Sequence, residues 1–270
     1  MFSSRLTHFI WYLIQDNRRN PVIARIALLF RNIHRAYEHP GHILELNGEG
    51  AFLDFLKKHR PPSVVFDVGA NVGDWSAVAR EFFPNAQLHL FEIAPPIFEK
   101  LQSRYRDQPQ FVLNKLGLSS EEKEVTLNFY PDHSELTSVE ISINSVQTER
   151  IQVWTKTGDQ YLESVGNIQV DLVKIDTEGM ELKVLQGFSK TLTERPPAFI
   201  QFEHFHGRAY LKDFYDLLVP HGYSIGKLYS TYVDFRSHDL SLENGIGPNY
   251  IAIHESAGEF IPLLKQSLSS

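Results

Sequence analysis

The fold is decided by the segment Val65-Phe66-Asp67-Val68-Gly69-Ala70-Asn71-Val72-Gly73. It continues an apolar run that begins at Ser63 and that predicts a buried strand. The glycines after the strand permit a tight turn, and the helix predicted to follow presents free N–H groups at its start. A strand, a glycine turn and a helix in this order are typical of an open α/β sheet, which binds ligands beyond the carboxyl ends of its strands.

Strand and helix signals alternate along most of the remaining chain. Further strands are predicted over residues 87–91, 110–114, 170–175, 198–203, 223–228 and 250–254. Helices are predicted over 50–59, 96–105, 180–188 and 208–219. Strands separated by helices imply βαβ units and a mostly parallel sheet. We therefore predict a Rossmann-like α/β domain over residues 51–270.

The stretch from about 119 to 155 interrupts this alternation. Short strands are predicted over 124–130 and 151–154, on either side of a polar segment, which indicates an insertion. Tyr130 and Trp154 would suit the stacking of a sugar ring, so the insertion is expected to cover an acceptor. The polar residues that would bind its hydroxyls are His133, Ser134, Glu135, Thr137, Ser138 and Asn144. The alternative is a hairpin that only extends the sheet.

Residues 1–50 are predicted to form a helical arm or cap. Apolar residues recur at helical spacing in two stretches, which Asn20-Pro21 separates. Residues 1–40 hold six arginines against Asp16 and Glu38, a net charge of +4, on a chain whose total is −7. Three interpretations remain open: a cap packed on the domain or on a second copy, helices on a membrane surface, and a mobile tail.

Composition narrows the class of protein. With 270 residues, 42% hydrophobic and 22% charged, the chain matches an ordinary globular protein and not a disordered one. The absence of cysteine excludes disulfides, thiolate nucleophiles and iron–sulfur clusters. The negative charge argues against a nucleic-acid surface. We find no signal peptide or apolar run of membrane-spanning length, and expect a cytoplasmic protein, peripheral to a membrane if the arm binds one.

Carboxylates end the first two strands. Asp67 precedes the glycine turn, and Glu92 ends the second strand. The spacing Gly69-x-Asn71-x-Gly73 departs from the nicotinamide motif, and a carboxylate at 67 would repel a pyrophosphate but attract a cation. S-adenosylmethionine carries a sulfonium and an ammonium group, and Glu92 is placed to bind its ribose hydroxyls. The sequence therefore predicts this cofactor, and disfavours a nicotinamide-linked oxidoreductase.

We expect the residues that act on the acceptor to lie at the ends of the later strands. Asp176 and Glu203 end the fourth and fifth of the sheet's predicted strands, and His204 follows directly. For transfer to an alcohol we predict His204 as the base, with Asp176 or Glu203 orienting it or binding an acceptor hydroxyl. For Glu178 we predict a structural role at the start of the next helix. These four residues would also suit Mg²⁺, but no short metal motif is present, so no metal ligand is assigned.

The segment 65–73 resembles motif I of class I methyltransferases, in the form that this motif takes in the FkbM family. Val173-Lys174-Ile175-Asp176-Thr177-Glu178-Gly179-Met180-Glu181 resembles the second signature of that family. Weaker elements are Thr157-Gly158-Asp159-Gln160-Tyr161-Leu162 and Asn249-Tyr250-Ile251-Ala252-Ile253. The likeness spans about residues 60–255. It implies a class I sheet with an antiparallel last strand, and O-methylation by S-adenosylmethionine, often of sugar hydroxyls in polyketides, glycolipids or polysaccharides.

The residues and the resemblance together give the expected site. The catalytic set is His204, Asp176 and Glu203. The cofactor set is Asp67, Gly69, Ala70, Asn71, Gly73, Glu92, Ile93, Leu116 and Asp176. The expected acceptor is a hydroxyl of a sugar-containing or polyhydroxylated small molecule or glycan. Asp176-Thr177-Glu178-Gly179 stands where amide and ring-nitrogen methyltransferases often carry Asn-Pro-Pro-Tyr, which disfavours that branch.

Two alternatives remain beside this expectation. One is a methyltransferase that acts on a peptide, a protein or another acceptor that contains no sugar. Another is a scaffold that binds the cofactor without catalysis. Whichever acceptor is used, we expect residues 1–40 to add a peripheral membrane contact or a contact with a second copy of the chain.

Overall fold

The computed structural model describes residues 4–38, 47–131, 148–204, 209–244 and 249–268. The chain divides into two compact units, Met1–Gly41 and His42–Ser270. This division comes earlier than the predicted boundary at residue 50. Asn47 and Glu49 are buried within the second unit, so the end of the expected arm contributes to the domain core.

The first unit contains the two predicted helices, α1 (Ser4–Asp16) and α2 (Pro21–Glu38). Polar side chains shape the turn between them. The side chain of Asn17 donates to the carbonyl of Leu13 at 2.9 Å, and that of Asn20 accepts from the N–H of Val22 at 2.9 Å. These bonds close one helix and open the next, as expected for asparagine at helix ends. No helix of the described chain combines the length and apolarity required to cross a membrane.

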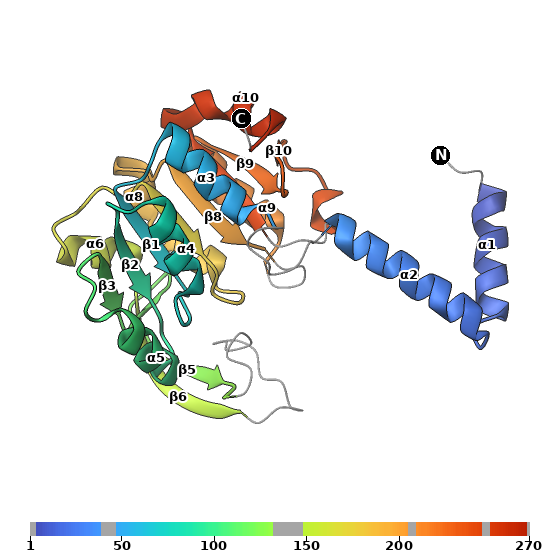
Figure 1. The fold of residues 1–270 in the computed structure, drawn as a ribbon, viewed down its shortest axis with the longest axis horizontal. Helices are drawn as coiled ribbons and strands as arrows, with labels where there is room; N and C mark the ends of the chain where they lie inside the picture. The colour runs from blue at the N-terminus through green and yellow to red at the C-terminus, as the bar shows by residue number, and fades with distance from the viewer. Residues whose placement is uncertain (1–3, 39–46, 132–147, 205–208, 245–248, 269–270) are drawn as a thin grey trace. The chain divides into compact units, whose positions relative to one another are not determined.

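The second unit is built on a sheet whose described strands lie in the order β10-β9-β11-β8-β7-β1-β2-β3 (Figure 1). They are β1 (Val64–Val68), β2 (Gln87–Phe91), β3 (Phe111–Asn114), β7 (Leu172–Ile175), β8 (Phe199–Glu203), β9 (Tyr223–Leu228), β10 (Val233–Phe235) and β11 (Asn249–His254). Strands β1, β2, β3, β7 and β8 pair in parallel. Strand β11 is antiparallel to both of its neighbours. The predicted mostly parallel sheet with an antiparallel last strand is confirmed.

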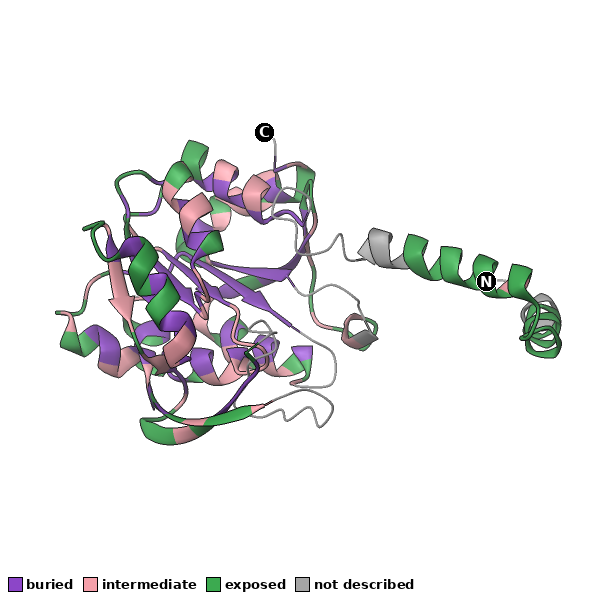
Figure 2. Ribbon diagram, turned by 60° about the horizontal axis from the view of Figure 1, so that its bottom comes forward, coloured by how far each residue is buried: buried purple, intermediate pink, exposed green. Residues whose placement is uncertain are grey.

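Helices cover both faces of the sheet, and each face has its own apolar core. Core residues of one face come from α3 (Glu49–His59), α4 (Asp74–Phe82), α5 (Pro95–Tyr105) and α10 (Ile261–Gln266). Those of the other come from α6 (Gly158–Ser164), α7 (Glu181–Gln186), α8 (Ser189–Glu194) and α9 (Leu211–Leu218). Short 3₁₀ turns are η2 (Val219–His221), η3 (Leu242–Asn244) and η4 (Glu255–Phe260). Figure 2 shows the central strands of the sheet buried between these layers.

The insertion forms a sheet of its own. Strands β4 (Gly117–Leu118), β6 (Glu149–Lys156) and β5 (Lys123–Phe129) pair in that order, and β5 and β6 pack on Ala94 and Ile97. The hairpin therefore does not extend the main sheet. Tyr130 is fully buried, so it is not available to stack on a sugar, whereas Trp154 is 60% exposed. The polar residues predicted to bind the acceptor, 133–144, lie outside the described residues.

The weaker motif at residues 157–162 has a structural explanation. Thr157 caps α6 in a reciprocal capping box with Gln160. A Cβ at Gly158 would lie 2.2 Å from the ring of Phe188, so only glycine fits there. Asp159 accepts from the N–H groups of Lys190 and Thr191, each at 2.9 Å, and so caps α8 from a distant part of the chain.

Candidate functional site

The turn after β1 is held in a conformation that requires its glycines. Gly69 and Gly73 have φ of +84°, and Asn71 lies between them at φ +49°. A Cβ at Gly69 would lie 1.8 Å from the carbonyl oxygen of Asp176, and the N–H of Gly69 donates to Phe91 at 3.0 Å. The turn is therefore seated tightly between the ends of β2 and β7. Glycines in such a turn let a ligand approach the backbone closely.

Replacing Gly69 by alanine should destabilise the domain more than replacing Gly166, which has a similar φ of +81° but open space within 4 Å of the position that a methyl group would take. Both changes carry the cost of a left-handed backbone, about 1 kcal/mol. Gly69→Ala adds a backbone clash, for which we expect about 2 kcal/mol more. Urea unfolding of both variants measures the difference. Equal losses would mean that the loop can move away from Asp176.

Glu92 joins the turn to the end of β2. One carboxylate oxygen accepts from the N–H of Asn71 at 2.9 Å, and the other from the N–H of Ala94 at 2.7 Å. Burial raises the pKa of Glu92 to about 7, against the opposing effect of these hydrogen bonds. The carboxylate is thus fixed beside the turn. Ile93 and Leu116 lie partly buried against different apolar clusters.

Asp67 differs from its expected role as an accessible carboxylate. It is fully buried, accepts from the hydroxyl of Ser76 at 2.6 Å, and has the ammonium group of Lys174 3.5 Å away. Burial raises its pKa, and the charge of Lys174 opposes that shift. The carboxylate of Asp67 is paired with the ammonium group of Lys174. Asp67 can therefore affect a ligand only indirectly, by positioning the residues around it.

Alternation along the strands gathers polar residues on the sheet face covered by α3 and α4. Asp67, Lys174 and Gln201 are direct neighbours in the register of β1, β7 and β8. Asn249 of β11 pairs with Glu203 of β8 in the same way. Apolar residues two positions before them on their strands, Val65, Leu172 and Phe199, belong to the core of that face. The carboxyl ends of β1, β7 and β8, together with the amino end of the antiparallel β11, therefore carry a buried polar cluster.

Lys174 is the central cation of this cluster. Its ammonium group lies 3.1 Å from a carboxylate oxygen of Asp176 and 5.7 Å from the ring of Trp75. Burial lowers the pKa of Lys174, but the surrounding carboxylates, Asp176 and Asp67 foremost, raise it by more. Lys174 stands in a family signature, but the sequence predicted no role for it. The available signal was a lysine between Val173 and Ile175 in an otherwise apolar strand.

Glu49 is a second residue whose role was not predicted from the sequence. It lies in the first turn of α3, and its buried carboxylate accepts from the side-chain amide of Gln201. Burial raises the pKa of Glu49, and it raises that of Glu203 well above the usual range, where the charge of Asp176 adds to the effect. Carboxyl groups in such a site bind protons more readily than they do in water.

Glu181 holds the loop after β7. One carboxylate oxygen of Glu181 accepts from the N–H and hydroxyl of Thr177 and from the N–H of Gly179, at 2.9–3.0 Å. A carboxylate at the start of α7 therefore holds this loop, and it is that of Glu181. The structural role expected for Glu178 stays a prediction. Glu178 itself has φ of +56°, an uncommon conformation for a residue other than glycine.

The three predicted catalytic residues differ in exposure. The side chain of Asp176 is 31% exposed at the rim, whereas Glu203 and His204 are buried. Nε2 of His204 lies 2.9 Å from the carbonyl oxygen of Ala209, which can only accept, so this nitrogen carries the hydrogen. If His204 accepts a proton, it would therefore do so at Nδ1. Its ring packs edge-on against Phe214 and Tyr250.

Polar atoms without hydrogen bonds mark the same edge of the sheet. Among the described residues, buried side-chain atoms without a hydrogen-bond partner belong to Asp67, Asn71, Trp75, Gln201 and Asn249. The Asp67 oxygen is the one paired with Lys174, so the open atoms are those of the other four residues. Buried polar groups are normally satisfied, and the concentration of open ones at one edge indicates a site completed by a ligand. The described side chains contain no group of three or more histidine or acidic residues arranged to hold a metal ion.

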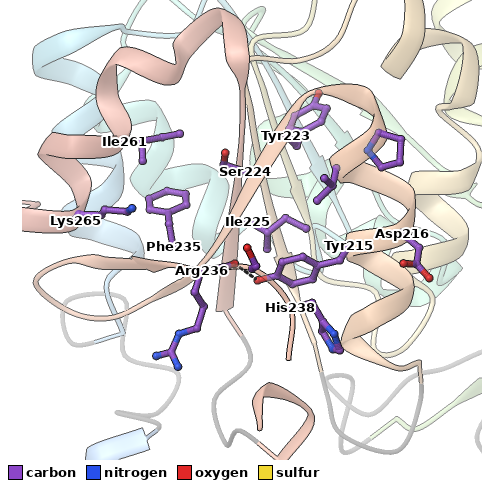
Figure 3. A pocket seen from close by; sticks show the side chains of 13 residues that line it. Tyr215, Asp216, Tyr223, Ser224, Ile225, Phe235, Arg236, His238, Ile261 and Lys265 are labelled. Carbon is purple, nitrogen blue, oxygen red and sulfur yellow. Dashed lines mark hydrogen bonds between the residues drawn. The ribbon is translucent and has the colours of Figure 1, made fainter. Parts of the chain in front are cut away.

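A cavity of about 790 Å³ lies at the opposite edge of the sheet (Figure 3). Tyr223 at the start of β9 lines it and pairs with His254, whereas Asn249 at the other end of β11 pairs with Glu203. The hydroxyl of Tyr215 donates to the carbonyl of Arg236 at 3.0 Å along its wall. This cavity contains none of the residues predicted for the site.

Comparison with known proteins agrees with this geometry. The methyltransferase FkbM domain matches residues 67–225, which is more than half of the chain. The chain belongs to the FkbM methyltransferase family. The matched segment begins at Asp67, includes the turn, Glu92, Lys174 and Gln201, and ends in β9. The fold is the α/β class I fold of S-adenosylmethionine-dependent methyltransferases.

Relatives in the family differ widely in length. Hexuronic acid methyltransferase AglP of Haloferax volcanii is 28% identical over 178 residues, 64% of this chain and 71% of AglP. The 31-O-demethyl-FK506 methyltransferase FkbM of Streptomyces tacrolimicus is 28% identical over 47% of this chain and 60% of its own. The matched segment spans 8% of the antimetabolite synthetase AmbE of Pseudomonas aeruginosa. Among solved structures, an O-methyltransferase from Bacillus cereus in complex with SAH has a TM-score of 0.47 at 12% identity, over 83% of this chain and 88% of its own.

Proposed function

We propose that the protein transfers the methyl group of S-adenosylmethionine to a hydroxyl of a sugar-containing or polyhydroxylated small molecule or glycan. The observation that carries the proposal is the glycine turn fixed beside the Glu92 carboxylate, at a sheet edge with unsatisfied buried polar atoms. The names of two relatives, a hexuronic acid methyltransferase and an FK506 O-methyltransferase, support the acceptor class.

The proposed cofactor position follows from the turn. Glu92 would accept from the ribose hydroxyls, because a carboxylate at the end of the second strand can bind both. The backbone of 69–73 and the unsatisfied amide oxygen of Asn71 would bind the amino-acid end, which carries the ammonium group. Asp67 and Lys174 would act indirectly, by holding the floor of the site and orienting Asp176.

Methyl transfer is an in-line displacement. The acceptor oxygen forms a bond to the methyl carbon as the carbon–sulfur bond breaks, sulfur leaves as a neutral thioether, and the acceptor proton passes to a base. The site must align oxygen, carbon and sulfur and exclude water. Asp176 is the exposed member of the catalytic set, so we propose that it binds the acceptor hydroxyl. Nδ1 of His204 would then take the proton.

Two measurements test the function. Calorimetry should detect binding of S-adenosylhomocysteine (SAH), and mass spectrometry should detect the gain of one methyl group on a hexuronic acid or a related polyol. Binding of a nicotinamide dinucleotide instead of SAH would overturn the proposal. Methylation of a peptide but of no sugar would move the acceptor to another class.

Replacing Asp176 by asparagine or His204 by glutamine should lower kcat at least about tenfold, because each removes an acceptor of the hydroxyl proton or its hydrogen bond. Asp216→Asn is the matched control, since this exposed carboxylate on α9 lies outside the site. Thermal unfolding separates loss of chemistry from loss of fold. Full activity in both site variants would exclude these residues from the reaction.

A further inference from the structure

Large apolar side chains of α1 and α2 lie in solvent. They range from 42% to 69% exposed, and Figure 2 shows both helices exposed along their described lengths. The side chains are Phe9, Ile10, Trp11, Tyr12, Leu13, Ile14, Val22, Ile26, Leu28, Leu29, Phe30 and Ile33. Contiguous exposed apolar surface of this kind marks an interaction site.

The apolar side chains of α2 share one face. Val22, Ile26, Leu29, Phe30 and Ile33 follow the i, i+4, i+7, i+8, i+11 spacing of a helical stripe. The exposed Arg25 and Arg31 lie off this stripe, as does Leu28.

In α1 the stripe is shorter along the helix and has aromatic borders. Phe9, Ile10, Leu13 and Ile14 share a face. Trp11 lies on one side of this face and Tyr12 on the other, since successive residues are about 100° apart. Both of these rings are exposed. Tryptophan and tyrosine prefer the boundary between an apolar phase and water.

The charged residues of these helices are mostly positive. Arg18 and Arg19 are exposed in the turn between them, and residues 1–40 carry six arginines against two acidic residues. A second copy of the same arm would bring one charge of +4 against another. An anionic lipid surface offers opposite charge to the arginines and apolar depth to the stripes.

We propose that α1 and α2 bind the surface of an anionic lipid bilayer. Their apolar faces enter the boundary between head groups and acyl chains, and Arg25 beside the stripe and Arg18 and Arg19 in the turn contact lipid phosphates. This binding is independent of the methyl-transfer reaction, because it uses only the first unit of the chain.

Flotation of the full chain with phosphatidylcholine vesicles, with and without phosphatidylglycerol, tests the proposal. We expect binding to the anionic vesicles that weakens as salt is added. Replacing Arg25 by glutamine should weaken binding about fivefold, because Arg25 borders the stripe and lies near the lipid surface. Arg31→Gln is the matched control, since Arg31 lies on the opposite side of the helix and its loss should weaken binding less.

Ile26→Asp and Leu28→Asp form a matched pair. Both side chains are apolar and equally exposed, at 47% and 46%, and both changes add one negative charge to the same helix. They lie about 200° apart around it, so only Ile26 is on the stripe. Ile26→Asp should weaken binding more than about tenfold, and Leu28→Asp by clearly less.

Absence of flotation with anionic vesicles at low salt would overturn the proposal. Equal losses in the Ile26 and Leu28 variants would overturn the orientation of the helix. Analytical ultracentrifugation without lipid tests the alternative partner, a second copy of the chain. If the protein is a dimer that Ile26→Asp dissociates, and it does not bind vesicles, the apolar faces belong to a dimer interface.

Discussion

Replacing Lys174 by methionine is expected to destabilise the domain by about 3–5 kcal/mol near neutral pH. The change removes the ammonium group between Asp67 and Asp176 and leaves their carboxylates without a buried counter-charge. Methionine keeps most of the volume, so packing against Trp75 is little altered. Chemical unfolding measures the loss, and the corresponding fall in Tm is about 6–20 °C.

The pH dependence of this variant separates charge from packing. Without Lys174, the pKa values of Asp67 and Glu203 in the folded state rise further above their unfolded values. The folded state then binds more protons than the unfolded state, so the stability of the variant should recover as pH falls. Lys190→Met is the control, because Lys190 pairs with Glu163 on the surface and its loss should change stability little. A pH-independent loss would assign the effect to packing.

Replacing Glu92 by glutamine is expected to weaken SAH binding about 100-fold. The two ribose hydroxyls would then donate to a neutral amide instead of a charged carboxylate, and such hydrogen bonds are weaker. The amide would also place an N–H group against the N–H of Asn71 or Ala94, which the carboxylate accepts in the native chain. Isothermal calorimetry of SAH measures the change.

The raised pKa of Glu92 predicts how binding by the native chain depends on pH. With a pKa of about 7, the carboxylate that would bind the ribose is mostly protonated one unit below that value. SAH binding should therefore be about tenfold weaker at about pH 6 than at about pH 8. The glutamine variant should show no such step. A step of equal size in both proteins would assign the titration to another group.

The sheet and the turn could be predicted because their signals are local. The apolar run before Gly69 and the glycines after it specify a strand and a turn from neighbouring residues alone. The placement of Glu92 at the end of β2 followed from the strand that precedes it. The burial of Asp67 against Lys174 was not predicted, because it depends on the neighbouring strand β7.

The polar cluster could not be predicted because it depends on register. Lys174, Gln201 and Glu49 come from three elements, and only the pairing of β7 with β8 and the packing of α3 bring them together. A single-residue shift of register would send these side chains to the other face. The separate sheet of the insertion was missed for a similar reason, since a hairpin pattern does not specify its partner strands.

The close contact between Gly158 and the ring of Phe188 links two positions thirty residues apart in the sequence. Neither can grow unless the other shrinks, because the space between α6 and the start of α8 is already filled. Members of the family with a bulkier side chain at the position of Gly158 should therefore carry a smaller one at that of Phe188. The two sites should vary as a size-compensating pair.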